Sequence, residues 1–317
     1  MYSLTGQNIL ITGASGFLGK HLRRRLESLD VELHLVSRRE QSSSRPNTCW
    51  WQGDCADNHF VQNVVKQVRP AVIFHLAGNA TGQRELKFVL PTYHDNLTAT
   101  INVLTAATEN GVSRIVLAGS LEEPSAAEEE VIPSSPYAAA KWGCSTYARM
   151  FHALYGTPVV IPRIFMTYGP LVENRKKLVP YVIQSFLHDE APMLSNGDRF
   201  IDWIYVEDVI DGLVRMAAIQ GIEGETFDLG SGVLISIRDL VARIARLTQA
   251  SVAPVFGALP QRQMEQERVA DVAKTSARLA WEPRVGLEEG LSQTIEWMKN
   301  SLASDVPDQE VSANSRG

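Results

Sequence analysis

A tyrosine and a lysine near the middle of the chain have the spacing of a catalytic pair. Tyr137 and Lys141 are separated by three alanines, and residues four apart lie on one face of a helix. A phenol is a poor base at neutral pH, but a neighbouring ammonium group and an oxidised nicotinamide both favour the phenolate. Tyr137 is therefore predicted to move a proton while hydride moves to or from a cofactor. Taken alone, the spacing also fits an exposed helix pair.

A glycine-rich loop follows the first predicted strand, residues 8–12, and runs into a predicted helix. Glycines in this position allow a tight turn, a close approach of the backbone to a pyrophosphate, and close packing of the helix on the strand. The start of the helix offers free N–H groups and a partial positive charge to the phosphates. We therefore predict a dinucleotide site formed by Gly13, Ser15, Gly16, Phe17, Leu18 and Gly19.

The residues that end the next two predicted strands bear on the choice of cofactor. Arg38 and Arg39 stand where an NAD-selective site usually places a carboxylate for the ribose 2′-hydroxyl, and an arginine there favours a 2′-phosphate. We therefore expect NADP(H) to be favoured over NAD(H), with Arg38 as the better candidate. Two solvated arginines are the alternative. Asp54 follows the next short strand and is placed to meet the adenine, although an ordinary turn fits it as well.

The first two thirds of the chain alternates short β-branched apolar runs with helical patterns, which is typical of βαβ units and a parallel sheet. Strands are predicted at residues 8–12, 32–37, 71–76, 114–118 and 158–163. Helices are predicted at residues 18–29, 60–68, 97–110 and 137–154. The expected fold class is therefore α/β, a Rossmann-type doubly wound parallel sheet with a smaller, interleaved C-terminal substrate lobe.

The later part of the chain has a looser pattern, with a predicted helix at 177–187 and strand-like segments at 200–206 and 226–229. The chain is thus expected to pass between sheet and lobe more than once. We assign residues 1–167 and about 202–232 to the dinucleotide-binding domain. The substrate lobe is assigned to about 168–201 and 233–299. Residues 300–317 are polar and without period, and are expected to form a disordered tail.

Composition limits the classes of partner. The 317 residues are 44% hydrophobic and 21% charged, with a formal charge of −6, and no basic run suggests a nucleic-acid surface. No apolar stretch reaches the roughly 20 residues that cross a bilayer, and the first strand begins too early for a signal peptide. Cys49, Cys55 and Cys144 lack the spacing of a metal site. We expect a cytoplasmic protein that binds no metal, membrane or nucleic acid.

These features, together with Ser120 just after a predicted strand, resemble the extended short-chain dehydrogenase/reductase family, specifically its nucleotide-sugar epimerase/dehydratase group. The resemblance spans about residues 5–298 and includes many matches in the same order. They are Phe74-His75-Leu76-Ala77-Gly78, Asn96 with Asn102-Val103-Leu104, Ser135-Pro136-Tyr137, Arg163 with Tyr168-Gly169-Pro170, Ile204-Tyr205-Val206-Glu207-Asp208-Val209, Leu229-Gly230-Ser231-Gly232 and Trp281-Glu282-Pro283.

The resemblance implies roles for individual residues. Ser120 would bond the reacting sugar oxygen, Tyr137 would be the acid/base, and Lys141 would bind the nicotinamide ribose and favour the Tyr137 phenolate. Further cofactor contacts would come from Leu76, Ala77, Gly78 and Asn96, and substrate contacts from Asn79 and Arg163. The family also implies a nucleotide-diphosphate sugar as substrate and a homodimer formed through helices at 97–110 and 137–154.

Three positions depart from the family pattern. Dehydratases of this group carry Asp-Glu after the serine or threonine, but this chain has Leu121-Glu122. Glu122 could act as a base, whereas leucine cannot donate a proton. Met166 replaces a common asparagine, and Ile201 stands where an arginine usually reaches the diphosphate. Arg199 is the candidate for that role, with Arg262 as a second phosphate ligand, so the substrate pocket is expected to be atypical.

Four functions fit these residues. An epimerase-type oxidoreductase that moves hydride at a sugar carbon is favoured, and an NADPH-dependent nucleotide-sugar 4-ketoreductase is the main alternative. An atypical dehydratase is disfavoured by Leu121. A non-catalytic dinucleotide-binding sensor is disfavoured because Ser120, Tyr137 and Lys141 are all retained.

Overall fold

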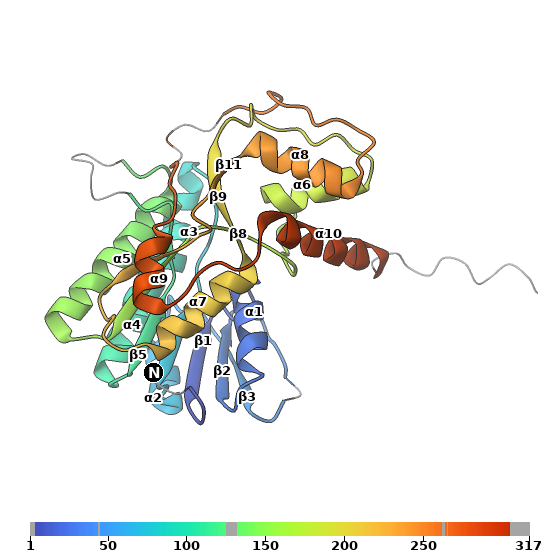
Figure 1. Cartoon of the computed structure of the whole chain (residues 1–317). Coiled ribbons are helices and arrows are strands. Elements are labelled where there is room, and N and C mark those ends of the chain that lie inside the picture. The colour runs from blue at the N-terminus through green and yellow to red at the C-terminus, as the bar shows by residue number, and fades with distance from the viewer. Residues whose placement is uncertain (1–3, 44, 125–131, 262–263, 265, 305–317) are drawn as a thin grey trace, which may run out of the picture. The chain divides into compact units, whose positions relative to one another are not determined.

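The computed structural model describes residues 4–43, 45–124, 132–261, 264 and 266–304 (Figure 1). The strands are β1 (Asn8–Thr12), β2 (Glu32–Ser37), β3 (Thr48–Gln52), β4 (Val72–His75), β5 (Arg114–Leu117), β6 (Gly119–Ser120), β7 (Val159–Ile164), β8 (Met166–Tyr168), β9 (Phe200–Tyr205), β10 (Thr226–Leu229) and β11 (Leu234–Ser236). The helices are α1 (Phe17–Leu26), α2 (Asn58–Val68), η1 (Leu86–Phe88), α3 (Val89–Thr92), η2 (Tyr93–Thr98), α4 (Ala99–Glu109), α5 (Pro136–Tyr155), α6 (Leu178–Leu187), α7 (Val206–Ala218), α8 (Ile237–Thr248), α9 (Val272–Leu279) and α10 (Leu287–Ser304).

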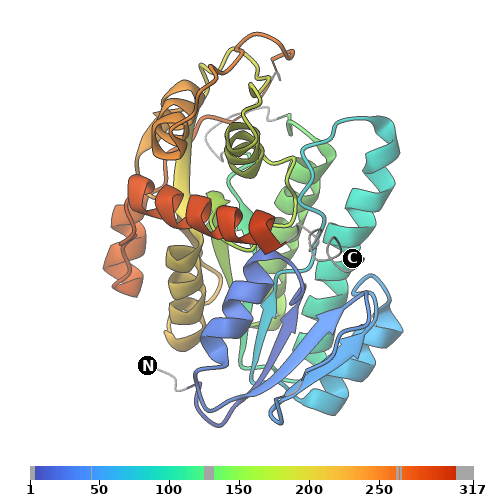
Figure 2. The ribbon, with the colours of Figure 1, turned by 90° about the vertical axis from the view of Figure 1, so that its right-hand side faces the viewer.

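A parallel sheet forms the centre of the part of the chain that was predicted to bind a dinucleotide. Its strand order is β10-β7-β5-β4-β1-β2-β3, with β6 beside β7. The blue arrows of β1, β2 and β3 lie side by side in Figure 2. The order reverses between β1 and β4, and ligands of doubly wound sheets bind beyond the carboxyl ends of the strands at such a point. The predicted fold class is confirmed.

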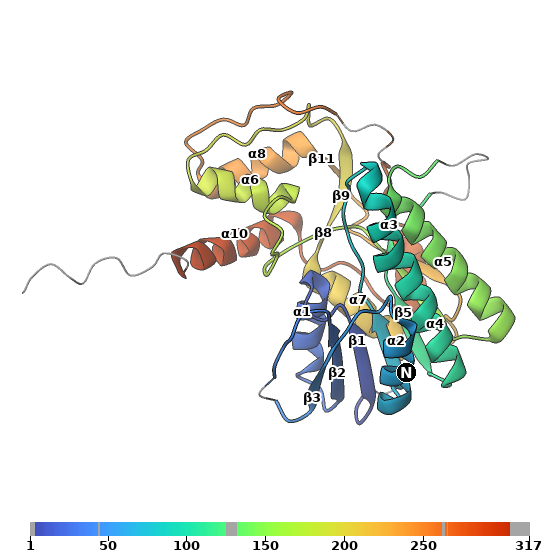
Figure 3. The same ribbon diagram turned by 180° about the vertical axis from the view of Figure 1, so that it is seen from behind.

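Helices cover both faces of this sheet. On one face lie α2, α4 and α5 (Figures 1 and 3). Their buried residues share a continuous apolar core with Leu10, Ile73 and Ile115. On the other, α1 packs against α7. Ile9 and Ile11, which flank Leu10 on β1, are also fully buried. Successive strand residues point to opposite faces, so the strands are apolar on both sides, as is usual in covered parallel sheets.

Helix α5, which carries Tyr137 and Lys141, and helix α1, which follows the glycine-rich loop, begin in different ways. Helix α5 starts at Pro136 after Ser135, whose hydroxyl accepts a hydrogen bond from the Ala138 N–H at 3.1 Å. It ends at Tyr155 and is capped by Gly156, which has φ of 68°. These are strong start and stop signals. Helix α1 instead follows Gly16, which has no side chain to cap it. The first N–H groups of α1 are thus not held by a side-chain cap.

The helical segment before α4 is longer than predicted. Instead of beginning at residue 97, the chain coils from Leu86 through η1, α3 and η2 directly into α4. The η2 segment is a π-helical turn that contains Asp95 and Asn96. Such turns interrupt the regular hydrogen-bond pattern and are frequent at functional sites. Nothing in the apolar pattern of this segment predicts the extra residue of a π-turn.

The chain divides into two compact units. The first comprises Met1–Thr167, Arg199–Ile235 and Arg262–Arg284 and contains the sheet. The second comprises Tyr168–Asp198, Ser236–Gln261 and Val285–Gly317. Within the described residues of the second unit, α6, α8 and α10 pack on one another. Glu288 of α10 pairs with Arg243 and Arg246 of α8.

Two predicted boundaries are wrong. The segment 262–284 was assigned to the lobe but joins the sheet-containing unit, because the Trp281 side chain is buried there and donates to the Asp208 carbonyl at 3.0 Å. The predicted tail also begins too early, since α10 continues to Ser304. Leu291, Ile295 and Met298 repeat at helical spacing and are buried. Residues 305–317 lie outside the described residues.

Candidate active site

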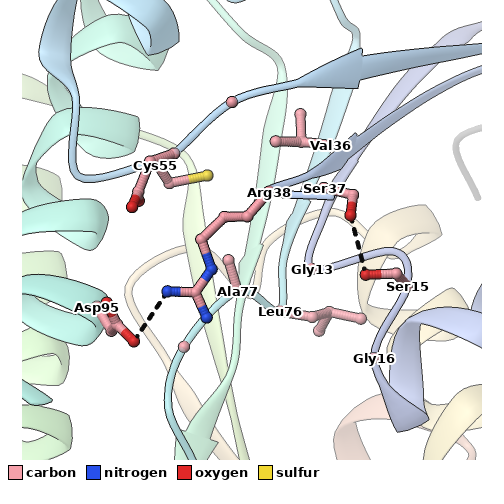
Figure 4. Close-up of a pocket in the computed structure, with 13 residues that line it drawn as sticks. Gly13, Ser15, Gly16, Val36, Ser37, Arg38, Cys55, Leu76, Ala77 and Asp95 are labelled. Atoms are coloured by element: carbon pink, nitrogen blue, oxygen red, sulfur yellow. Dashed lines mark hydrogen bonds and ion pairs between the residues drawn. The ribbon is translucent and has the colours of Figure 1, made fainter. Parts of the chain in front are cut away.

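A pocket with a volume of about 190 Å³ lies at the predicted dinucleotide site. It draws residues from the ends of β1, β2, β3 and β4 and from η2 (Figure 4). Of the predicted cofactor residues, the lining includes Gly13, Ser15, Gly16, Arg38, Asp54, Leu76, Ala77 and Gly78. It also includes residues that were not predicted: Val36, Ser37, Gly53, Cys55 and Asp95. The sequence prediction therefore named most of the residues that line this pocket and also Asn96 of η2, but it did not name Asp95 of the same turn.

The glycines of the loop are required by close approaches. Gly13 has φ of +70°, and a Cβ there would lie 2.7 Å from the Ala77 nitrogen. A Cβ on Gly19 would lie 2.2 Å from the Gly13 carbonyl oxygen. The loop is thus pressed against the β4 end on one side and against α1 on the other. Phe17 and Leu18 lie in the first turn of α1, and neither is among the described residues that line the pocket.

A buried histidine holds the wall of this pocket. His75 is 1% exposed, and its Nδ1 lies 2.7 Å from the Thr12 hydroxyl while its Nε2 lies 3.2 Å from the Thr100 hydroxyl. Burial, and to a lesser degree the charge of Lys141, lowers the pKa of His75 to about 3. The Ala77 N–H donates to the same Thr12 hydroxyl at 3.2 Å. A neutral His75 therefore ties β1, β4 and α4 together directly behind the pocket.

Lys141 reaches the pocket wall from α5. It is 7% exposed, and its Nζ donates to the Ala118 carbonyl at 2.9 Å. A Cβ on Gly78 would lie 3.8 Å from Lys141 Nζ and 2.4 Å from Asn96 Oδ1. Asn96 is buried beneath Gly78, where its amide donates to the carbonyls of Thr92 and Asn79. Lys141 and Asn96 thus flank Gly78, and Asn96 supports this loop from below.

Ser120 stands on β6, against which α5 packs. Its hydroxyl accepts from the Glu122 N–H at 3.2 Å, and its own N–H donates to Glu123 Oε1 at 2.7 Å. Glu123 is 2% exposed, and burial raises the pKa of its carboxyl group. The sequence prediction did not single out Glu123. Its position just after Ser120 in a short turn was the only available signal.

The predicted substrate residues are engaged with other protein groups. Glu122 Oε1 lies 3.6 Å from Arg199 Nη2, and Arg199 Nη2 also donates to the Gln266 carbonyl at 2.8 Å. Arg163 Nη1 pairs with Asp228 Oδ1 at 2.9 Å. Arg262 lies outside the described residues. Arg199 was predicted to bind a phosphate and Glu122 to act as a base, whereas the structure pairs the two side chains with one another.

The described part of the chain also bears on possible partners. Within it, no cluster of three or more His, Cys, Asp or Glu side chains could hold a metal ion. No helix in the same residues is long and apolar enough to cross a membrane. Cys49, Cys55 and Cys144 are free of disulfides.

Comparison with known proteins assigns the family. Residues 9–230 match the model of the NAD dependent epimerase/dehydratase family. The chain belongs to this family. Its relatives include a dTDP-glucose 4,6-dehydratase of Haemophilus influenzae, 26% identical over 94% of this chain and 99% of the relative. A UDP-glucuronate 4-epimerase of Thermodesulfobacterium geofontis is 25% identical over 92% of this chain and 96% of the relative.

Solved structures of other proteins share the fold. UDP-glucose 4-epimerase of Thermotoga maritima, solved with UDP-glucose, superimposes with a TM-score of 0.85 at 23% identity, covering 93% of this chain and 99% of that one. The Bordetella bronchiseptica enzyme WbmF, solved with NADH, gives a TM-score of 0.82 at 25% identity, covering 95% and 94%. The family is described as NAD-dependent, so the predicted preference for NADP(H) gains no support from these relatives.

Proposed function

We propose that this family member is an epimerase-type oxidoreductase that moves hydride at a carbon of a nucleotide-linked sugar, with Tyr137 as the acid/base. The position of Lys141 carries the proposal. Its ammonium group is fixed by the Ala118 carbonyl beside Gly78 of the dinucleotide pocket, and Tyr137 lies one turn earlier on α5. Tyr137 and Lys141 lie four residues apart, on one face of the helix, and so serve the same site.

The pocket fits a dinucleotide on structural grounds. Gly13 and Gly19 leave space that a Cβ would fill, and α1 begins without a side-chain cap, which suits a pyrophosphate. When bound, the nicotinamide supplies the hydride acceptor and donor. Lys141 would hold the adjoining ribose, Tyr137 would exchange a proton with the sugar hydroxyl or ketone, and the Ser120 hydroxyl would orient that same oxygen.

Elimination of water is the less suitable reaction for this site. The family's dehydratases need an acid next to the base, but Leu121 is apolar and 5% exposed. Glu122, the carboxylate directly after Leu121, is paired with Arg199 and accepts a hydrogen bond from Ser134. We therefore propose that the ketone formed by hydride transfer is reduced again instead of being dehydrated. Asn79 and Arg163 stay predictions as substrate contacts.

The experiment is a product analysis with purified protein. The nucleotide released on denaturation is identified, and a panel of nucleotide-diphosphate sugars is then incubated with the protein. Interconversion of two sugars without net use of the dinucleotide supports an epimerase. Stoichiometric consumption of NADPH with a 4-keto nucleotide sugar would establish the ketoreductase instead. Failure to bind any dinucleotide would overturn the proposal.

We also propose a homodimer and a cytoplasmic location. Leu86, Val89, Leu90 and Tyr93 are exposed apolar residues on the helical segment before α4, and Trp142 is exposed on α5; the two helical stretches pack together. A second copy would cover this apolar face. The three free cysteines are consistent with a reducing compartment.

A further inference from the structure

An acidic residue that no motif singles out faces Arg38 in the dinucleotide pocket. Asp95 stands on the π-helical turn η2, and its Oδ2 lies 3.2 Å from Arg38 Nη1. Figure 4 shows the Arg38 side chain extending from the end of β2 to meet it. The Asp95 side chain is 18% exposed and that of Arg38 is 63% exposed. The carboxylate is therefore the more firmly placed partner of the two.

The net charge of the residues that line this pocket does not favour a phosphate. Arg38 is the cation among the lining residues, whereas Asp54 and Asp95 are both anions. Asp54 is held in place because its Oδ1 accepts the Ala56 N–H at 2.9 Å. One cation against two carboxylates leaves the described lining with a formal charge of minus one. The guanidinium group that would neutralise a 2′-phosphate is already engaged by Asp95.

NAD(H) and NADP(H) differ at the adenosine ribose by a single group, a 2′-hydroxyl in the first and a 2′-phosphate in the second. A 2′-phosphate brings a charge of about −1.5 to −2 at neutral pH, which the nearby carboxylates repel. A 2′-hydroxyl is uncharged and donates a hydrogen bond that a carboxylate accepts. We propose that Asp95 sets the choice of cofactor, because it engages Arg38 and keeps the adenosine end of the pocket net negative, so that NAD(H) is favoured over NADP(H).

This inference rests on the proposed function, since it takes the pocket to hold a dinucleotide. It reverses the expectation drawn from Arg38 alone. That expectation treated an arginine after β2 as available to a phosphate, whereas the available charge depends on a residue 57 positions later in the chain. Arg39 does not change the balance, because it is exposed and is not among the residues that line the pocket.

The test compares binding of NAD⁺ and NADP⁺ to the full chain, freed of bound nucleotide, by isothermal titration calorimetry. Wild-type protein should bind NAD⁺ more tightly. Asp95→Asn removes the charge with little change of shape, and it should raise the affinity for NADP⁺ relative to NAD⁺ by about fivefold, the effect of about 1 kcal/mol expected for one partly exposed ion pair. Asp30→Asn, an exposed aspartate that is not among the pocket-lining residues, is the matched control and should leave the ratio unchanged.

The same substitution in an Arg38→Ala protein tests whether Asp95 acts through Arg38. In Arg38→Ala protein the same Asp95→Asn change should shift the ratio less, because no guanidinium group is released. The inference is overturned if Asp95→Asn moves the ratio no more than Asp30→Asn, or if the wild-type chain prefers NADP⁺. In both cases dinucleotide binding itself, and with it the proposed function, would stand. Binding of neither dinucleotide would refute both.

Discussion

Arg199 and Glu122 form an ion pair beside Ser120, with 3.6 Å between Arg199 Nη2 and Glu122 Oε1. The side chains are only 12% and 20% exposed. Glu122 also accepts a hydrogen bond from Ser134, and Arg199 donates to the Gln266 carbonyl. The pair thus connects the turn after β6 with the segment before β9 and with the chain that leads to α9. A carboxylate held in this way is poorly suited to act as a free base.

A double-mutant cycle tests the pair. Glu122→Gln and Arg199→Gln should each lower the free energy of unfolding by about 1 to 2 kcal/mol, because each leaves a charged partner with little solvent. The double variant should lose less than the sum of the two. Urea denaturation measures all four proteins. Strictly additive losses would show that the two side chains do not stabilise one another.

Replacing Gly13 by alanine should damage both stability and cofactor binding. Gly13 and Gly6 have nearly the same positive φ, +70° and +74°, but a Cβ on Gly13 would meet the Ala77 backbone whereas one on Gly6 meets nothing within 4 Å. Gly6→Ala therefore reports the conformational cost alone, about 1 to 2 kcal/mol. Gly13→Ala should cost more and should abolish NAD⁺ binding in calorimetry. Equal losses in the two variants would contradict the close approach.

Stability should fall with acid in a way that depends on His75. The pKa of this buried imidazole is lowered to about 3, so between that value and about 6.5 the unfolded chain binds a proton that the folded chain does not. His75 therefore contributes a loss of up to about 1.4 kcal/mol per pH unit as the pH falls through this window.

Unfolding of His75→Asn, followed between pH 7 and pH 4, should show a shallower decline than the wild-type protein. His188→Asn, at an exposed position, is the control and should follow the wild-type curve. Since both variants keep the other titrating groups, the difference between the curves isolates His75. Parallel curves for all three proteins would rule out the assigned role.

The proposed dimer can be tested with one charge. Leu90 is 66% exposed on α3, and Leu90→Lys places an ammonium group in the face that a second copy would cover. Light scattering after size-exclusion chromatography should show the wild type at twice the chain mass and the variant largely at the mass of one chain. Leu259→Lys, at a leucine 51% exposed in the second unit, should stay dimeric. A monomeric wild-type protein would refute the proposal.

The sequence predicted those parts of the fold and site whose structure depends on residues close together in the chain. The strand-loop-helix of Gly13 to Gly19 and the start of α5 at Ser135-Pro136 depend on neighbouring residues, so turn and cap signals suffice. The alternating β and α pattern likewise specified the parallel sheet, because crossover helices must cover both of its faces.

What sequence could not predict are pairings between distant residues. Asp95, which stands on a π-turn, meets Arg38 from 57 positions away, and no apolar period signals that turn. Arg199 was predicted to bind a phosphate, but in the structure Glu122 lies beside it. The segment that ends at Trp281 contains only the short helix α9, whose pattern does not predict the unit to which the segment belongs. Burial of the Trp281 indole determines that unit.

The role of Tyr137 is the point on which the proposed chemistry depends, and a single substitution isolates it. Tyr137→Phe removes the phenolic oxygen and keeps the ring. With a nucleotide-diphosphate sugar that the wild-type protein converts, kcat should fall by about 10² to 10⁴-fold, the range for loss of a general acid/base, while NAD⁺ affinity stays unchanged. Full activity of Tyr137→Phe with intact NAD⁺ binding would contradict the assignment of Tyr137 as the acid/base.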